Sequence, residues 1–120
     1  MKIIGIDPGL VQTGFGIINV SNNQTTLIDY GIIKPQPKDT LANRLLTIFN
    51  DVCEIISNYN PQIFAIEEVF YGKNVKSAMR LGQARGASMV AAASKKIPIY
   101  EYSARKVKQS ITGNGNAHKT

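Results

Sequence analysis

Acidic residues follow two apolar segments at the points where those segments end. Asp7 comes directly after residues 2–6, and the pair Glu67 and Glu68 comes directly after residues 63–66. Such segments are typical of neighbouring strands in one sheet, so we expect the carboxylates to meet at a shared edge. Mg2+ prefers oxygen ligands, and a cation between two carboxylates offsets their mutual repulsion. The pattern therefore predicts a magnesium site formed by Asp7 and the acidic pair.

A plainer alternative is that Asp7 caps a turn and that the two glutamates are solvated residues at a strand end. Pro8 and Gly9 favour the metal site, because a further strand candidate at residues 13–18 returns almost at once. The chain would then make a tight hairpin directly beside the acid.

The hydrophobic pattern predicts the elements that would position these acids. Strands are expected near residues 2–6, 13–20, 26–33, 63–66 and 98–102, with Asn22 and Asn23 in the second turn. Helices are expected from the cap Asp39 to about residue 59, from about 74 to 95, and in short segments that begin after Ser103 and Asn116. A meander followed by alternating helices and strands predicts an α/β fold, with a five-stranded mixed sheet and helices on both faces.

Positive charge is concentrated in the second half of the chain. Residues 1–70 carry four Lys or Arg residues against seven acids, whereas residues 71–120 carry ten against Glu101 alone. A solvated helix surface normally mixes both signs, so this excess favours binding of a polyanion such as a nucleic acid. The ten cations are Lys73, Lys76, Arg80, Arg85, Lys95, Lys96, Arg105, Lys106, Lys108 and Lys119.

Length and composition indicate one soluble domain. A chain of 120 residues can bury a core without disulfides or structural metals. The single cysteine, Cys53, lies among the apolar positions of a predicted helix and is interpreted as a small buried residue. The apolar segment before Asp7 is too short for a signal peptide, and no segment approaches membrane-spanning length. We therefore expect a cytoplasmic protein that does not bind membranes.

Phe70 and Tyr71 follow the acidic pair immediately. An aromatic residue at such a place often anchors a loop in the core. Phe70, however, stands between the predicted metal site and a basic helix, where an unpaired base could stack on its ring. We favour stacking for Phe70 and leave Tyr71 open.

Small residues recur at every fourth position of the helix that follows, at Ala78, Gly82 and Gly86. Glycine inside a helix costs about 1 kcal/mol relative to alanine, so close packing is expected to compensate. Packing on the sheet and packing across a subunit interface fit the pattern equally well.

Four ordered motifs of this chain resemble the RuvC family of bacterial Holliday-junction resolvases. They are Gly5-Ile6-Asp7-Pro8-Gly9 with residues 13–16, then residues 65–70, residues 81–86, and residues 107–109 with Gly113 and Lys119. The resemblance implies a ribonuclease H-like fold, a homodimer, and cleavage of two strands of like polarity at a four-way DNA junction during recombination and repair. It implies two Mg2+ ions per active site, with Mn2+ as a substitute, products with 5′ phosphates, and the RuvA–RuvB branch-migration complex as a partner.

The resemblance also implies roles for individual residues. Asp7 matches the first catalytic aspartate and Glu67 the catalytic glutamate, both as metal ligands, while the position of Glu68 needs no acid. Phe70 matches the aromatic residue that engages bases near the crossover. Lys108 and Lys119 match basic residues beside the scissile phosphate, so we expect them to act in catalysis and to contact DNA. From the concentration of positive charge in the second half, we also expect DNA contacts at Lys73, Lys76, Arg80 and Arg85.

One departure from the family pattern bears on activity. Members of the family complete the metal site with two further acids on a C-terminal helix, whereas this chain has no Asp after Asp51 and no acid after Glu101. We therefore expect residues 1–120 to form a single ribonuclease H-like nuclease domain that lacks its C-terminal helical part and is inactive in this form.

Two other functions remain open. The chain could be a non-catalytic module that binds branched DNA through its basic half. It could also be a fragment of an actin-like ATPase, whose first hairpin carries a similar Asp-x-Gly turn, although the threonine-rich phosphate loop of that class is missing here. Junction cleavage with Mg2+ separates the nuclease from the binding module, and ATP binding would favour the third function.

Overall fold

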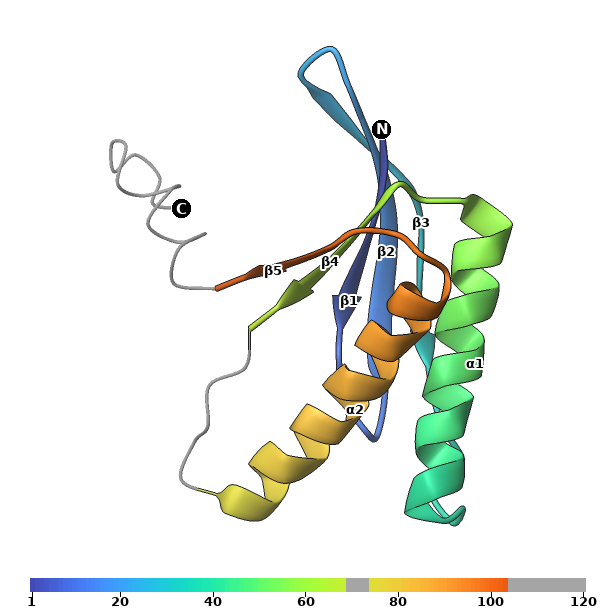
Figure 1. The fold of residues 1–120 in the computed structure, drawn as a ribbon, viewed down its shortest axis with the longest axis vertical. Coiled ribbons are helices and arrows are strands. Elements are labelled where there is room, and N and C mark those ends of the chain that lie inside the picture. Colours follow the sequence, from blue (N-terminus) through green and yellow to red (C-terminus); the bar gives the residue numbers. More distant parts are fainter. Residues whose placement is uncertain (69–73, 104–120) are drawn as a thin grey trace.

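The computed structural model describes residues 1–68 and 74–103, and its elements follow the predicted order (Figure 1). They are β1 (Lys2–Asp7), β2 (Thr13–Ser21), β3 (Gln24–Ile33), α1 (Leu41–Tyr59), β4 (Ile63–Glu67), α2 (Val75–Ser94) and β5 (Ile99–Tyr102). The short helices expected after Ser103 and Asn116 lie outside the described residues.

The five strands form one mixed sheet in the order β3-β2-β1-β4-β5. β1 pairs antiparallel with β2 and parallel with β4, so it is the central strand from which both halves of the sheet extend. The turn between β2 and β3 contains Asn22 and Asn23, whose φ angles of 50° and 64° are both positive. Asparagine tolerates this left-handed geometry, which suits the twist of a two-residue hairpin. The five-stranded mixed sheet is confirmed.

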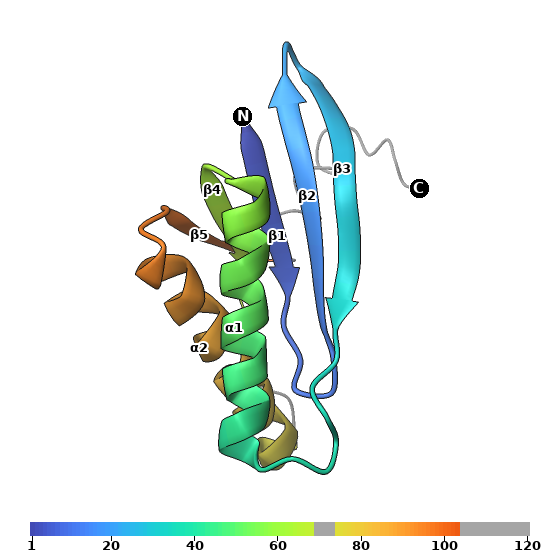
Figure 2. The same ribbon diagram turned by 90° about the vertical axis from the view of Figure 1, so that its right-hand side faces the viewer.

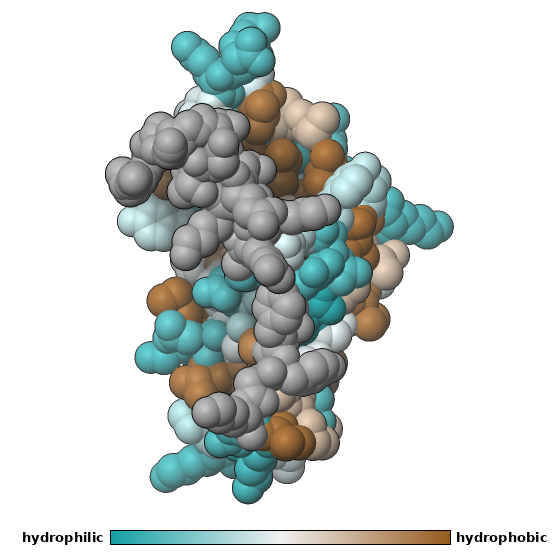
Figure 3. Space-filling view, turned by 90° about the vertical axis from the view of Figure 1, so that its left-hand side faces the viewer, coloured by the Kyte–Doolittle hydropathy of each residue, from teal (hydrophilic) through white to brown (hydrophobic). Residues whose placement is uncertain are grey.

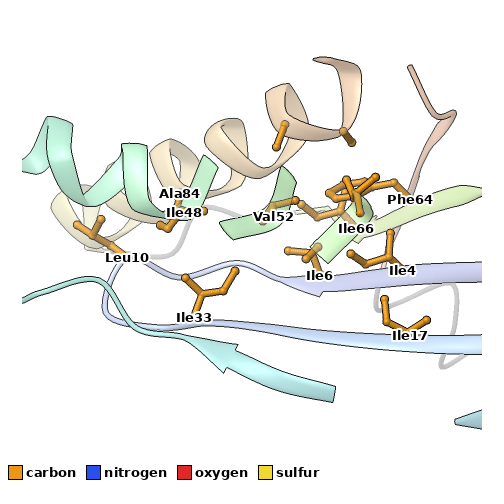
Figure 4. Packing of buried hydrophobic residues seen from close by; sticks show 13 residues of the cluster. Ile4, Ile6, Leu10, Ile17, Ile33, Ile48, Val52, Phe64, Ile66 and Ala84 are labelled. Atoms are coloured by element: carbon orange, nitrogen blue, oxygen red, sulfur yellow. The ribbon is translucent and has the colours of Figure 1, made fainter. Parts of the chain in front are cut away.

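Both described helices cover the same face of the sheet, as the edge-on view in Figure 2 shows, so within residues 1–68 and 74–103 the helices do not lie on both faces as predicted. Figure 4 shows Ile4, Ile6 and Ile17 pointing from the strands toward the helices, where Ile48 and Val52 of α1 meet them. All five side chains are almost completely removed from solvent. We call the opposite surface of the sheet the open face, because no helix of residues 1–68 or 74–103 covers it.

The N-terminus of α1 differs from the prediction by one residue. Thr40, not Asp39, is the N-cap: its hydroxyl accepts a hydrogen bond from the N–H of Asn43 at 3.1 Å. Asp39 instead accepts from the N–H of Thr40 at 3.1 Å. Both side-chain types cap helices well, so composition alone does not choose between adjacent candidates.

The small residues of α2 serve two different surfaces. Ala84, Ala91 and Ala92 are completely buried in the core that α2 shares with α1 and the sheet. In contrast, a Cβ atom added to Gly82 or Gly86 would meet no atom within 4 Å. Packing within one chain therefore accounts for the alanines but not for the two glycines.

Candidate active site

Asp7 and Glu67 are the last residues of two adjacent parallel strands, β1 and β4. Ile6 pairs with Ile66, so the two acids that follow these residues lie side by side. The buried Ile6 and Ile66 face the helices, and side chains alternate along a strand, so both carboxylates face the open side of the sheet. The predicted meeting of acids at one edge corresponds to this geometry. Asp7 is exposed and Glu67 is partly buried.

Glu68 differs from Glu67 in its position relative to the strand and in its exposure to solvent. It follows the last residue of β4 and is exposed, and its backbone N–H donates to the carbonyl of Tyr102 at 2.6 Å. Glu67 is therefore the member of the pair that a strand position orients toward the same side as Asp7.

A shallow hollow of about 300 Å³ lies beside Asp7, and glycines form much of its lining. Gly5, Gly14 and Gly16 contribute bare backbone, and Tyr102 of β5 completes the lining near the acids. A Cβ atom on Gly5 or Gly16 would meet nothing within 4 Å. The glycines thus leave space next to a carboxylate, as expected where another group approaches the strands closely.

Two hydrogen bonds between Gly9 and Thr13 stabilise the turn after Asp7. The Thr13 hydroxyl donates a hydrogen bond to the carbonyl of Gly9 at 2.7 Å, and the Gly9 N–H donates to the Thr13 hydroxyl oxygen at 3.2 Å. A Cβ atom on Gly9 would stand 2.3 Å from the Gln12 carbonyl oxygen, so only glycine fits there. The buried Thr13 pairs with Ile33 and so anchors the end of the hairpin in the sheet. The sequence Asp-Pro-Gly therefore holds the carboxylate at a defined place.

Tyr102 is a site residue that sequence analysis does not single out. It pairs with Glu67 across β4 and β5, and its side chain is 39% exposed. Partial burial, followed by the negative charges of Glu67 and Asp7, raises the pKa of the Tyr102 phenol above its usual value. A neutral hydroxyl therefore stands beside the two carboxylates. Its position at the end of a strand, like those of Asp7 and Glu67, is the sequence signal that could have found it.

Arg85 holds the ends of β4 and β5 together from the helix side. Its Nε donates to the Glu67 carbonyl at 3.2 Å, and its Nη2 forms an ion pair with Glu101 at 2.5 Å. The Arg85 side chain is 17% exposed. A guanidinium used in this way favours a positioning role over the predicted DNA contact.

The other predicted basic residues divide into two groups. Lys76 and Arg80 are exposed on the first turns of α2, one helical turn apart, where solvent and ligands reach them. Lys73, Lys108 and Lys119, together with Phe70 and Tyr71, lie outside the described residues.

The donor set of Asp7 and Glu67 fits a Mg2+ ion. Magnesium usually binds through one or two carboxylates together with waters and substrate phosphates. Among residues 1–68 and 74–103, no cluster of three or more His, Cys, Asp or Glu side chains is present. The two carboxylates could therefore supply only part of the ligands of such an ion.

Residues 3–120 match the family model described as crossover junction endodeoxyribonuclease RuvC. The chain belongs to the RuvC family. A RuvC from Saccharophagus degradans is 48% identical over 118 residues, a match that covers 98% of this chain and 68% of that protein. The family predicted from the four motifs is thus confirmed.

Solved structures agree with this assignment. The fold resembles that of a Thermus thermophilus RuvC solved in complex with a Holliday junction substrate, with a TM-score of 0.85 and 30% identity over 98% of this chain and 75% of that one. The yeast mitochondrial Holliday junction resolvase Ydc2 has the same fold, with a TM-score of 0.71 at 12% identity, covering 96% of this chain and 58% of that one. The ribonuclease H-like fold predicted from the sequence is confirmed. Neither helix of the described part of this RuvC-family chain is long and apolar enough to span a membrane.

Proposed function

We propose that this chain is the nuclease domain of a Holliday-junction resolvase, which nicks two strands of like polarity and leaves 5′ phosphates. The observation that carries the proposal is that Asp7 and Glu67 directly follow the paired residues Ile6 and Ile66, on the open face of a RuvC-family fold. The Thermus thermophilus relative, solved on a Holliday junction, supports the choice of substrate.

In this proposal Asp7 and Glu67 hold Mg2+, with Mn2+ as a substitute. A bound divalent ion supplies positive charge to the phosphate and lowers the pKa of a bound water. The described residues position these ligands. The hydrogen bonds of Thr13 to Gly9 hold the strand end at Asp7, and the hydrogen bond of Arg85 to the Glu67 carbonyl holds the strand end at Glu67. A centre with two ions needs more carboxylate than this pair supplies, so we propose that the intact site draws further acids from a C-terminal helical part.

DNA binding is assigned to the basic second half of the chain. Lys76 and Arg80 are exposed, as such contacts require. We assign Phe70 to bases at the crossover, and Lys108 and Lys119 to the scissile phosphate. Lys73 belongs to the same proposed surface.

A homodimer is also part of the proposal, and a groove between the helices supports it. The groove, about 420 Å³ in volume, is lined by apolar residues of α1 and by Gly86 and Val90 of α2. Leu46 and Val90 are 51% and 58% exposed there. The unfilled space at Gly82 and Gly86 would let a second α2 approach closely. Such an assembly, located in the cytoplasm, would act with the RuvA–RuvB complex.

One observation favours a second candidate function, a module that binds branched DNA without cutting it. The described residues contain no group of three or more His, Cys, Asp or Glu side chains that could hold a metal ion. A chain with the DNA-binding surface but too few carboxylates would hold junctions and leave them intact.

The experiment that tests the proposed function compares the two adjacent glutamates. We define the extended chain as residues 1–120 joined to the part of the Saccharophagus degradans relative that follows the matched region. In the extended chain, Glu67→Gln should abolish Mg2+-dependent nicking of a synthetic four-way junction, while Glu68→Gln, a matched change one residue away, should leave it near normal. Junction affinity should be unchanged in both variants. The reverse pattern would show that Glu68 is the ligand, and loss of activity in neither variant would rule out a metal site at this strand end.

A further inference from the structure

A second cavity lies on the other side of the turn that follows Asp7. It has a volume of about 430 Å³ and is lined by residues 9–12 of the turn, Arg44 of α1, and Ser77, Arg80 and Leu81 of α2. Two arginines therefore line one cavity, and the turn separates this cavity from the carboxylates of the candidate active site.

One buried hydrogen-bond donor of Arg44 has no partner among residues 1–68 and 74–103. The Nη2 of Arg44 donates to the Leu10 carbonyl at 3.3 Å, but its Nε is buried and has no partner in the described part of the chain. A buried donor without a partner costs free energy, and the cost is larger for a charged group. Some acceptor is therefore expected at Arg44.

The described residues offer no negative charge to this pair of arginines. Within these ranges the single ion pair joins Arg85 to Glu101, and no acid lines the cavity. Two cations at one cavity repel each other unless an anion lies between them. Guanidinium groups bind phosphate in a bidentate, charge-assisted way, so phosphate matches both the charge and the unused donors.

We propose that Arg44 and Arg80 bind one phosphate group of a DNA strand in this cavity, next to the turn that carries Asp7. The DNA source rests on the proposed nuclease function, whereas the affinity for phosphate rests on the cavity alone. A phosphate held here fixes the strand relative to the carboxylates, because residues 8–12 connect the two places directly. Arg44 and Arg80 are thus positioning residues for the strand.

The first arm of the test uses inorganic phosphate and no DNA. Phosphate, compared with chloride at equal ionic strength, should raise the unfolding temperature of residues 1–120, because a ligand that binds the folded state stabilises it. Arg80→Gln and Arg44→Gln should each remove most of this shift. Lys38→Gln, which removes an exposed cation away from the cavity, should retain it. Arg80 is exposed, so its variant should fold even if Arg44→Gln does not. An equal phosphate shift in Arg80→Gln and the unaltered chain would overturn the proposal.

The second arm measures DNA affinity as a function of salt. Each phosphate neutralised contributes about 0.9 to the slope of log K against log salt concentration. The double variant Arg44→Gln/Arg80→Gln should lose about 0.9 if both arginines share one phosphate. A loss of about 1.8, or no loss, would contradict shared binding. Failure of the proposed function would look different: the unaltered chain would not distinguish a four-way junction from linear duplex, while the phosphate shift would persist.

Discussion

At the scale of single residues, the chemistry of the candidate active site depends on the positions of four side chains. Asp7, Glu67 and Tyr102 end three adjacent strands and share the open face, whereas Glu68 lies beyond its strand. The sequence predicts that the two acids meet at one edge of the sheet, because each follows an apolar segment typical of a strand. The position of Tyr102 at a strand end can be found in the sequence, but its place beside Glu67 cannot, because the pairing of β5 with β4 depends on tertiary structure.

The environment of Tyr102 gives a prediction about pH. Burial, then Glu67 and Asp7, raise the pKa of this phenol. Asp7→Asn or Glu67→Gln should lower it toward the usual value of about 10, because each removes a negative charge. Glu68→Gln should change it little. Titration of isotope-labelled tyrosine by NMR measures these values, and a Tyr102 pKa that is the same in all variants would show that the phenol does not sense the acids.

The sign of the linked stability effect follows from the same shift. A raised folded-state pKa means that the folded protein favours the neutral phenol. The stabilisation is complete below the unfolded-state pKa of about 10 and is lost as the pH rises through the folded-state value. Tyr102→Phe should therefore unfold with a weaker pH dependence in alkaline solution than the unaltered chain, as thermal unfolding between neutral and alkaline pH would reveal.

At the scale of elements, the strand ends depend on a few ties between neighbours. The sequence predicts all five strands and both long helices, because their apolar periods are clear. It misplaces the cap at Asp39 by one residue, and it does not predict the ion pair between Arg85 and Glu101. Charge counts cannot reveal such pairing, because Arg85 and Glu101 belong to different elements and their proximity arises from packing.

Arg85 provides the prediction at this scale. Arg85→Met should lower the free energy of unfolding by about 1–2 kcal/mol, because it leaves the Glu67 carbonyl and Glu101 without their donor. The expected loss of unfolding free energy is small because the Glu101 side chain is 45% exposed, and solvent weakens an exposed ion pair. Chemical denaturation measures the loss, and Lys76→Met, which alters an exposed residue of the same helix, is the control.

A DNA readout separates the two roles considered for Arg85. If it positions the strand ends, Arg85→Met should leave the salt dependence of DNA binding unchanged. If a stable Arg85→Met variant lowers the slope of log K against log salt concentration by about one, the contribution of a phosphate contact, that result would support the DNA contact predicted for Arg85.

At the scale of the whole molecule, charge asymmetry and the open face determine the behaviour of residues 1–120. Hydrophobic and hydrophilic residues are interspersed on the side of the molecule shown in Figure 3, and hydrophilic residues gather at the end formed by the β2–β3 turn. On the open face, Tyr30, Ile32 and Tyr100 are more than half exposed. Exposed apolar surface of this kind predicts a tendency to aggregate.

Residues 1–120 should bind DNA in a strongly salt-dependent way. Ten cations lie in residues 71–120, and if at least six neutralise phosphates, affinity should fall by about 10³-fold or more between low and physiological salt. Fluorescence anisotropy with labelled junction and duplex DNA over a salt series measures this dependence. An affinity that hardly changes with salt would mean that the basic half is not a DNA-binding surface.

If Asp7 and Glu67 form the nuclease centre, the nicking rate of a labelled four-way junction in Mg2+ depends on both of them. The extended chain should nick the junction and leave 5′ phosphates, residues 1–120 alone should bind it but nick it negligibly, and Asp7→Asn in the extended chain should slow nicking by about 10³-fold or more, because loss of a metal ligand costs several kcal/mol in the transition state. Nicking by the Asp7→Asn variant at the unaltered rate would show that Asp7 is not part of the nuclease centre.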